Sequence, residues 1–121
     1  MKPKSFLIVA AAAGTATLAI AQNAMPGMPM AKGPAGEGYM KSMMTMHESM
    51  TSMKPTGDAD KDFVMMMTPH HQAAIDMAKV ELQFGKDSEI KKMAQDIIKA
   101  QEKEITEMKA WQAKHGSKLP K

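Results

Sequence analysis

Residues 39–115 are divided into three long segments by two short groups of helix-breaking residues. The first group is Lys54-Pro55-Thr56-Gly57, and the second is centred on Gly85. Apolar residues in each segment recur with the spacing of an amphipathic α-helix, and no segment shows the two-residue alternation of a strand. The predicted helices run from about Tyr39 to Met53, from Asp58 or Asp60 to Phe84, and from Asp87 or Ser88 to about His115. The fold class is therefore predicted to be all-α, a small bundle of three main helices.

The residues before these helices fall into two parts. Lys2 and Lys4 precede an apolar run that ends in Ala19-Ile20-Ala21, the small-x-small pattern of a signal-peptidase site. We predict a signal peptide over residues 1–21, with cleavage between Ala21 and Gln22, and a periplasmic or secreted protein. The alternative, an uncleaved membrane anchor, is disfavoured because the run is short and rich in alanine. Residues 22–38 are predicted to be a flexible Met/Pro/Gly-rich tail, and residues 39–116 the helical bundle domain.

The composition excludes several classes of function. The chain has no cysteine, so thiolate metal sites, disulfides and cysteine nucleophiles are ruled out. Every basic residue is lysine, and the formal charge is only +3, so the guanidinium groups that read guanine edges are missing. Nucleic acid is therefore not an expected partner. The serines lie at predicted helix caps or polar faces and form no triad, so the protein is not expected to be an enzyme.

Methionine is the unusual component, with 16 residues in a chain of 121. On a helical wheel the first helix gathers methionines and one histidine on one side, and Ser42, Thr45 and Ser49 on the other. We predict that the methionine side faces inward. Its members are Met40, Met43, Met44, Met46, His47, Met50 and Met53.

Two histidines in the second helix each lie one turn after a methionine. The pairs are Met66 with His70 and Met67 with His71. Both histidines are predicted to lie within a buried arc, with His70 near its centre. The other members of this arc are Phe63, Met66, Met67, Ala74, Ile75, Met77, Ala78, Leu82 and Phe84.

The third helix carries polar residues on its predicted buried side. Gln101 and Glu104 lie in the middle of that arc, and a buried carboxylate needs a partner, for which His70 or His71 is the candidate. The apolar members of the arc are Ile90, Met93, Ala94, Ile97, Ile98, Ile105, Met108 and Trp111.

Thioether and imidazole groups are ligands for soft ions, so the pattern predicts a site for Cu(I), with Ag(I) as a second possible ion. A protein exported without cysteine has methionine as its available soft ligand. The predicted main site consists of Met67, His70, His71 and Met77, helped by Met66, Met108 and Glu104. Further ions are predicted on Met40, Met43, Met44, His47 and Met50.

A run in the second helix also resembles a known family. Met67-Thr68-Pro69-His70-His71-Gln72-Ala73-Ala74-Ile75-Asp76-Met77-Ala78, followed by Gln101, Glu104-Ile105, Met108 and Trp111, is similar to the domain-of-unknown-function 305 family over about residues 58–115. The resemblance implies a ferritin-like helical bundle that is exported and often associated with copper tolerance. It also implies functional roles for the residues on the family motif, which are Met67, His70, His71, Met77, Gln101, Glu104 and Met108. Thr68 departs from the aliphatic residue that is usual in the family.

The leading hypothesis is a periplasmic protein that sequesters copper, with a copper export or transfer protein as a further partner. The alternative is a periplasmic chaperone or adaptor that uses a Met-rich apolar face, since methionine surfaces adapt to varied partners. A third hypothesis is a purely structural helical oligomer. One copy of the domain offers only three helices, so a homodimer that completes a larger bundle is expected.

Overall fold

The structure is a computed structural model that describes residues 32–115. It contains three helices, α1 (Gly33–Ser52), α2 (Ala59–Phe84) and α3 (Ser88–His115), and no strand among the described residues. The prediction of an all-α fold with three main helices is confirmed. The predicted signal peptide and residues 22–31 of the predicted tail lie outside the described residues.

The predicted helix ends agree with the structure for α2 and α3. Asp58 caps α2, because its carboxylate accepts hydrogen bonds from the backbone N–H groups of Asp60 at 3.0 Å and Lys61 at 3.2 Å. Asp87 caps α3 in the same way, with bonds from Glu89 at 2.8 Å and Ile90 at 3.1 Å. The start of α1 differs from the prediction. It begins at Gly33, with a proline in its first turn, instead of near Tyr39, and proline tolerates that position because the first N–H groups of a helix have no intrahelical partner.

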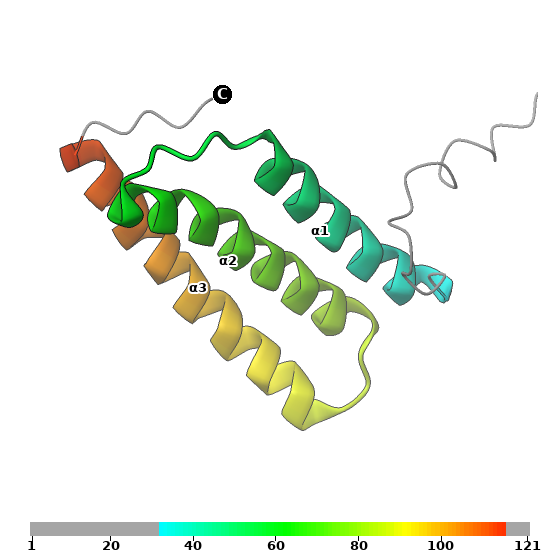
Figure 1. The fold of residues 1–121 in the computed structure, drawn as a ribbon. Coiled ribbons are helices and arrows are strands. Elements are labelled where there is room, and N and C mark those ends of the chain that lie inside the picture. Colours follow the sequence, from blue (N-terminus) through cyan, green and yellow to red (C-terminus); the bar gives the residue numbers. More distant parts are fainter. Residues whose placement is uncertain (1–31, 116–121) are drawn as a thin grey trace, which may run out of the picture. The chain divides into compact units, whose positions relative to one another are not determined.

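The three helices lie side by side, with α2 in the middle (Figure 1). α2 contacts both α1 and α3, while the backbones of α1 and α3 do not approach each other. The described part is therefore a layer one helix thick rather than a closed bundle. None of these helices has an apolar stretch long enough to cross a membrane.

α1 packs on α2 through small residues, which corrects the predicted orientation of α1. Gly38 lies against Val80, so closely that a Cβ at Gly38 would be 2.7 Å from Val80 Cγ2. Ser42 is 6% exposed, and its hydroxyl donates to the Gly38 carbonyl at 3.0 Å. The predicted inward methionine side is instead half-buried, and His47 is exposed. The physical reason is that small side chains let two helix backbones approach, and an internal hydrogen bond removes the cost of burying the serine.

The loop between α1 and α2 is held by a single carboxylate. Asp62 accepts hydrogen bonds from the backbone N–H and the hydroxyl of Thr56, both at 2.7 Å, and from the Gly57 N–H at 3.1 Å. These bonds, led by that from the Thr56 hydroxyl, hold the pKa of Asp62 below its ordinary value. Gly57 has a φ of +84°, a conformation that suits glycine.

The core follows the line of contact between neighbouring helices. Its buried apolar residues are Val64, Met65, Ala73, Ile75, Ala78, Ala94 and Ile105. Among the described residues, no large side chain is fully enclosed. A single layer of helices cannot surround a side chain on every side, so the core is thin.

This thin core explains why some residues of the predicted buried arcs are exposed. Ile75, Ala78, Ala94 and Ile105 are buried as predicted, and Met67, Ala74, Met77, Leu82, Ile98, Met108 and Trp111 are half-buried. The exposed members are Phe63, Met66, His70, Phe84, Ile90, Met93, Ile97 and Glu104. A wide apolar arc was expected to be surrounded by a bundle, but α2 has neighbours on only two sides and α3 on one.

Candidate metal centre

A hollow of about 350 Å³ lies between α2 and α3. Phe63, Met67 and His71 line it from successive turns of α2, and Glu104, Glu107 and Met108 line it from α3. The spacing of four residues places Met67 directly one turn from His71. Four of the predicted ligands, Met67, His71, Glu104 and Met108, are thus brought together by two different helices.

The ring of His71 is held in one orientation by its own helix. Its Nδ1 lies 2.9 Å from the Met67 carbonyl oxygen, and a carbonyl oxygen only accepts hydrogen bonds, so Nδ1 carries a proton and donates it. Nε2 is therefore the nitrogen that points toward α3. In metal sites, a histidine commonly donates one ring N–H to a carbonyl while the other nitrogen binds the ion. The same arrangement is already present at His71.

Glu104 occupies the position in front of Nε2. Its Oε2 lies 2.5 Å from Nε2 of His71, so the prediction that one of the paired histidines partners Glu104 is confirmed for His71. At this distance the ring nitrogen and the carboxylate are hydrogen-bond partners, and the contact is an ion pair whenever the ring is protonated. The His71 side chain is 13% exposed and that of Glu104 is 51% exposed, so the pair lies at the edge of the hollow, open to solvent.

Two thioethers complete the hollow. Met67 and Met108 are half-buried and lie on opposite sides of the α2–α3 boundary. The Thr68 hydroxyl donates to the Val64 carbonyl at 2.8 Å and lies 3.9 Å from the sulfur of Met108. The threonine that departs from the family pattern therefore contacts one of the two sulfur atoms.

The donor set suits a soft monovalent ion. Within residues 32–115 no group of three or more His, Asp or Glu side chains is arranged to hold a metal ion. The hollow instead offers two thioether sulfurs and one imidazole nitrogen, with a carboxylate beside them. Hard ions such as Mg²⁺ and Ca²⁺ need several oxygen ligands, whereas Cu(I) and Ag(I) bind sulfur and imidazole.

Three of the predicted ligands on α2 lie outside this hollow. His70 is exposed, Met66 is 44% exposed, and Met77 is half-buried away from the hollow. His70 and His71 are neighbours, so their side chains leave the helix about 100° apart, and only that of His71 is directed at α3. The prediction that Met67, His70, His71 and Met77 hold one ion stays a prediction, and of these four residues only Met67 and His71 line the hollow.

The predicted ligands on α1 form a separate group. Met40, Met43, Met44 and Met50 are half-buried, His47 is exposed, and none lines the hollow between α2 and α3. The backbone of α1 does not approach α3, so the structure does not bring these residues to the site that contains His71.

Two lining residues were not among the predicted ligands. Phe63 was expected in the buried arc but is 61% exposed at the mouth of the hollow. Glu107 lies one turn after Glu104 and forms an ion pair of 3.7 Å with Lys103. Glu107 lies three residues after Glu104, and this spacing places both carboxylates on one side of the helix, so the sequence contained the information needed to predict the second carboxylate.

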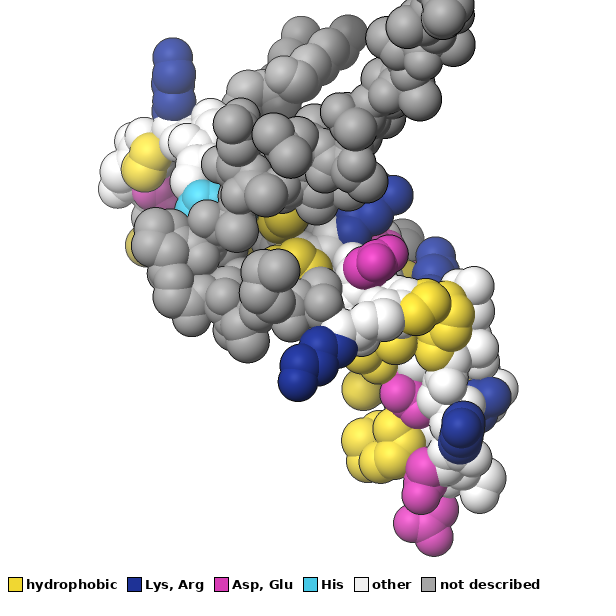
Figure 2. Space-filling view, turned by 90° about the vertical axis from the view of Figure 1, so that its right-hand side faces the viewer, with side chains coloured by type: hydrophobic (Ala, Val, Ile, Leu, Met, Phe, Trp, Pro, Cys, Tyr) yellow, Lys and Arg dark blue, Asp and Glu magenta, His cyan; other side chains and the backbone are white. Residues whose placement is uncertain are grey.

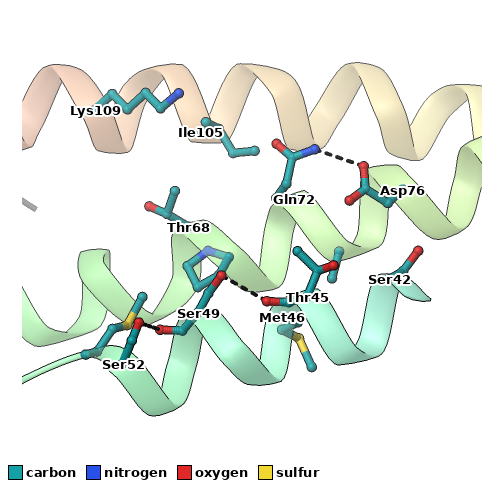
Figure 3. Close-up of a pocket in the computed structure, with 13 residues that line it drawn as sticks. Ser42, Thr45, Met46, Ser49, Ser52, Thr68, Gln72, Asp76, Ile105 and Lys109 are labelled. Atoms are coloured by element: carbon teal, nitrogen blue, oxygen red, sulfur yellow. Dashed lines mark hydrogen bonds between the residues drawn. The ribbon is translucent and has the colours of Figure 1, made fainter. Parts of the chain in front are cut away.

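A second hollow, of about 430 Å³, is lined by residues of all three helices. Figure 3 shows that α1 contributes mainly hydroxyl groups to this hollow, and that the Ser49 hydroxyl donates a hydrogen bond to the Thr45 carbonyl. On α2, the Gln72 side chain donates a hydrogen bond to the Asp76 carboxylate. Only Met46 and Met53 bring sulfur to this hollow. Its hydroxyl groups are mostly engaged within their own helices, so it offers no soft donor set comparable with that around His71.

Comparison with known proteins gives two matches. Residues 12–112 match the family described as "Domain of unknown function (DUF305)", a stretch that includes α1, α2 and most of α3. A curated relative, "Uncharacterized protein L153" of Acanthamoeba polyphaga mimivirus, is 47% identical over 49 residues, which is 40% of this chain and 32% of that protein. The matched part thus spans about a third of the relative's length, and neither description states an activity.

Proposed function

The chain belongs to the family named for the domain of unknown function DUF305, and from that premise we propose that it is an exported protein that binds Cu(I), and also Ag(I), through methionine and histidine side chains. Its role would be to sequester copper in the periplasm or to pass it to a copper export or transfer protein. The protein would act as a binding protein and not as an enzyme.

One observation supports this proposal most strongly. Met67, His71 and Met108 line one hollow, and Nδ1 of His71 donates to a backbone carbonyl, so that Nε2 is directed into the same space. Two sulfur atoms and one nitrogen form a soft three-ligand set. Thioethers are uncharged, so such a site binds a monovalent ion without burying several negative charges.

Two sequence features support an exported location. The predicted signal peptide over residues 1–21 would direct the chain out of the cytoplasm. The chain also contains no cysteine, and in an oxidising compartment free thiols would be converted to disulfides, whereas methionine keeps its ligand character.

The proposal extends to α1 as a place for further ions. Met43, His47 and Met50 follow one another at spacings of four and three residues, so they share one side of that helix. Met40 and Met44 border them. These ligands would bind independently of the hollow, because none of them lines it.

The test is a competition titration in which a Cu(I) chelator competes with the purified protein. The Met67→Leu/His71→Ala variant should bind copper in the hollow more weakly by on the order of 100-fold or more, because two ligands are lost. The matched control is Met66→Leu/His70→Ala, which makes the same two substitutions one residue earlier on α2 and should leave this affinity within about threefold of wild type.

Equal affinity of wild type and Met67→Leu/His71→Ala, with both in the micromolar range or weaker, would contradict a specific site in the hollow. Equal losses of copper affinity in both variants would indicate that the ions bind to ligands on α2 alone, without ligands from α3. Far-ultraviolet circular dichroism of each variant establishes that the helices are intact, since all four positions lie on α2.

The alternative function, an adaptor for apolar partners, is favoured by a different observation. Phe63, Met66 and Met93 are large apolar side chains that are 61%, 44% and 57% exposed. An adaptor would tolerate Met→Leu changes, because leucine keeps the volume and apolar character of methionine. A copper protein would not, because leucine has no sulfur.

A further inference from the structure

One side of the α2–α3 pair carries all the exposed large apolar side chains found in the described part of the chain. We call this side the open face. It consists of Phe63, Met66 and Phe84 from α2 and Ile90, Met93 and Ile97 from α3. Figure 2 shows how hydrophobic side chains reach the surface between charged ones in one view of the molecule.

The open face has the seven-residue repeat that is typical of the contact line between two packed helices. On α2, Phe63, His70, Met77 and Phe84 follow one another at intervals of seven residues, and on α3, Ile90, Ile97, Glu104 and Trp111 do the same. A seven-residue repeat keeps one line of side chains facing a packed neighbour along the length of a helix. Among residues 32–115 no third helix packs along this line, because α1 packs on α2 through Gly38 and Val80 and its backbone does not approach α3.

The lysines of both helices avoid the open face. On the helical wheel, those of α2 and α3 all fall outside the arc that contains the seven-residue lines. They are Lys61, Lys79, Lys91, Lys92, Lys99, Lys103, Lys109 and Lys114. A two-fold axis brings each face against an identical one, and a face without lysine avoids repulsion between ammonium groups there. The carboxylate on the seven-residue line, Glu104, is already paired with His71.

The area available is sufficient for a stable dimer. Helices of 26 and 28 residues are about 40 Å long at a rise of about 1.5 Å per residue. Two neighbouring helices span about 20 Å, so the open face covers about 800 Å². This is the area that each partner typically buries in a specific protein–protein interface. Covering it would also supply the enclosed core that the described helices do not form by themselves.

We propose that a second copy of this chain packs against the open face, with two-fold symmetry, to form a four-helix core from α2 and α3 of both copies. Phe63 belongs to the open face and also lines the hollow that contains His71, so the dimer interface borders the mouth of that hollow. The dimer itself does not depend on copper binding, and it forms without metal.

Sedimentation equilibrium of the metal-free protein, expressed from its complete sequence, tests the proposal. The wild type should be a dimer at about 10 µM, an ordinary affinity for an interface of this size. Met93→Glu places a charge in the centre of the face and should raise the dissociation constant of the dimer by about 10- to 100-fold. The matched control, Gln95→Glu, adds the same residue to an exposed position of α3 outside the open face and should leave that constant unchanged.

Two results would overturn the proposal. One is a monomer at concentrations up to about 100 µM, since a buried face of this size gives tighter association. The other is an equal dissociation constant for Met93→Glu and Gln95→Glu, which would place the contact on a different surface. The Met67→Leu/His71→Ala variant should remain a dimer while losing copper affinity, so failure of the dimer and failure of the copper proposal are distinguishable.

Discussion

The Nε2 atom of His71 lies 2.5 Å from Oε2 of Glu104, and this contact joins α2 to α3 within the hollow that contains two thioethers. The Nδ1 proton of the same ring is engaged with the Met67 carbonyl oxygen. A metal ion that binds Nε2 must therefore displace the carboxylate of Glu104 from its contact with this nitrogen. Ion binding and the contact between α2 and α3 are thus coupled at this site.

The affinity of the hollow for Ag(I), a redox-stable substitute for Cu(I), should fall as pH is lowered, because protons compete with the ion for Nε2 of His71. Isothermal titration calorimetry at a series of pH values measures this affinity.

The control is the His71→Ala variant, which should bind Ag(I) through thioethers alone. Thioether sulfur does not take up protons at ordinary pH, so affinity at sites that use only methionine should not change with pH. An Ag(I) affinity of the hollow that does not change with pH in the wild type would mean that Nε2 of His71 is not a ligand.

The contact of Gly38 with Val80 gives a prediction for stability. Gly38→Ala should push α1 away from α2, because the added Cβ lies within 2.7 Å of Val80 Cγ2. The cost of overpacking, about 1–3 kcal/mol, opposes a gain of about 1 kcal/mol in helix propensity. A double-mutant cycle with Val80→Ala separates the two effects and should give a coupling free energy of about 1–2 kcal/mol, measured by urea unfolding. Additive effects would show that the two residues do not constrain each other.

The sequence was sufficient to predict those features that depend on local interactions. Asp58, Asp87 and Gly85 lie at the helix ends where capping rules placed them. The partnership of Glu104 with one of two adjacent histidines was also predicted, because a carboxylate on an apolar arc needs a proton donor nearby. These features depend only on a few residues and on the period of the helix.

The features that were not predicted depend on how the helices are arranged in space. His70 is exposed because neither of the other described helices covers that side of α2, and no periodicity within α2 reports how many neighbours the helix has. The burial of Ser42 follows from the close approach of Gly38 to Val80, a contact between residues far apart in the sequence. A helical wheel ranks side chains by polarity, so it assigned the serine side of α1 to solvent and the methionine side to the core.

The hydroxyl of Tyr39 donates to Oε2 of Glu81 at 3.1 Å and links α1 to α2. Burial raises the pKa of Tyr39 above its ordinary value of 10.0, and the hydrogen bond to Glu81 and the charge of its carboxylate raise it further. The unfolded chain therefore loses this proton first as pH rises. The stabilisation by Tyr39 is fully present below about pH 10 and is lost as pH rises through the pKa of the folded state.

The Tyr39→Phe variant should be less stable than wild type at about pH 8 by about 0.5–1.5 kcal/mol, the net contribution of one hydrogen bond. This difference should shrink as pH rises above about 10 and through the raised pKa of Tyr39 in the folded state. Tyr39 is the single tyrosine of the chain, so absorbance of tyrosinate reports its titration directly in the folded and the urea-unfolded protein. A Tyr39 that titrates at the same pH in both states would contradict the contact with Glu81.

The Met67→Leu/Met108→Leu variant distinguishes copper binding from the adaptor function. Both side chains line the hollow, and leucine preserves their volume while removing the sulfur. Such swaps usually change the free energy of unfolding by less than about 1.5 kcal/mol, so the fold should persist. Affinity for Cu(I) should nevertheless fall by on the order of 10- to 100-fold for each ligand removed.

The matched control is Met66→Leu/Met77→Leu, which makes the same change at two positions of α2 outside the hollow. Cells that depend on this protein for growth in copper should lose tolerance with the first variant and keep it with the second. An adaptor would behave alike with both variants, because the apolar surface is preserved in each. Full copper tolerance with the Met67→Leu/Met108→Leu variant, at unchanged protein level, would therefore favour the adaptor, since it would show that the two sulfur atoms are dispensable.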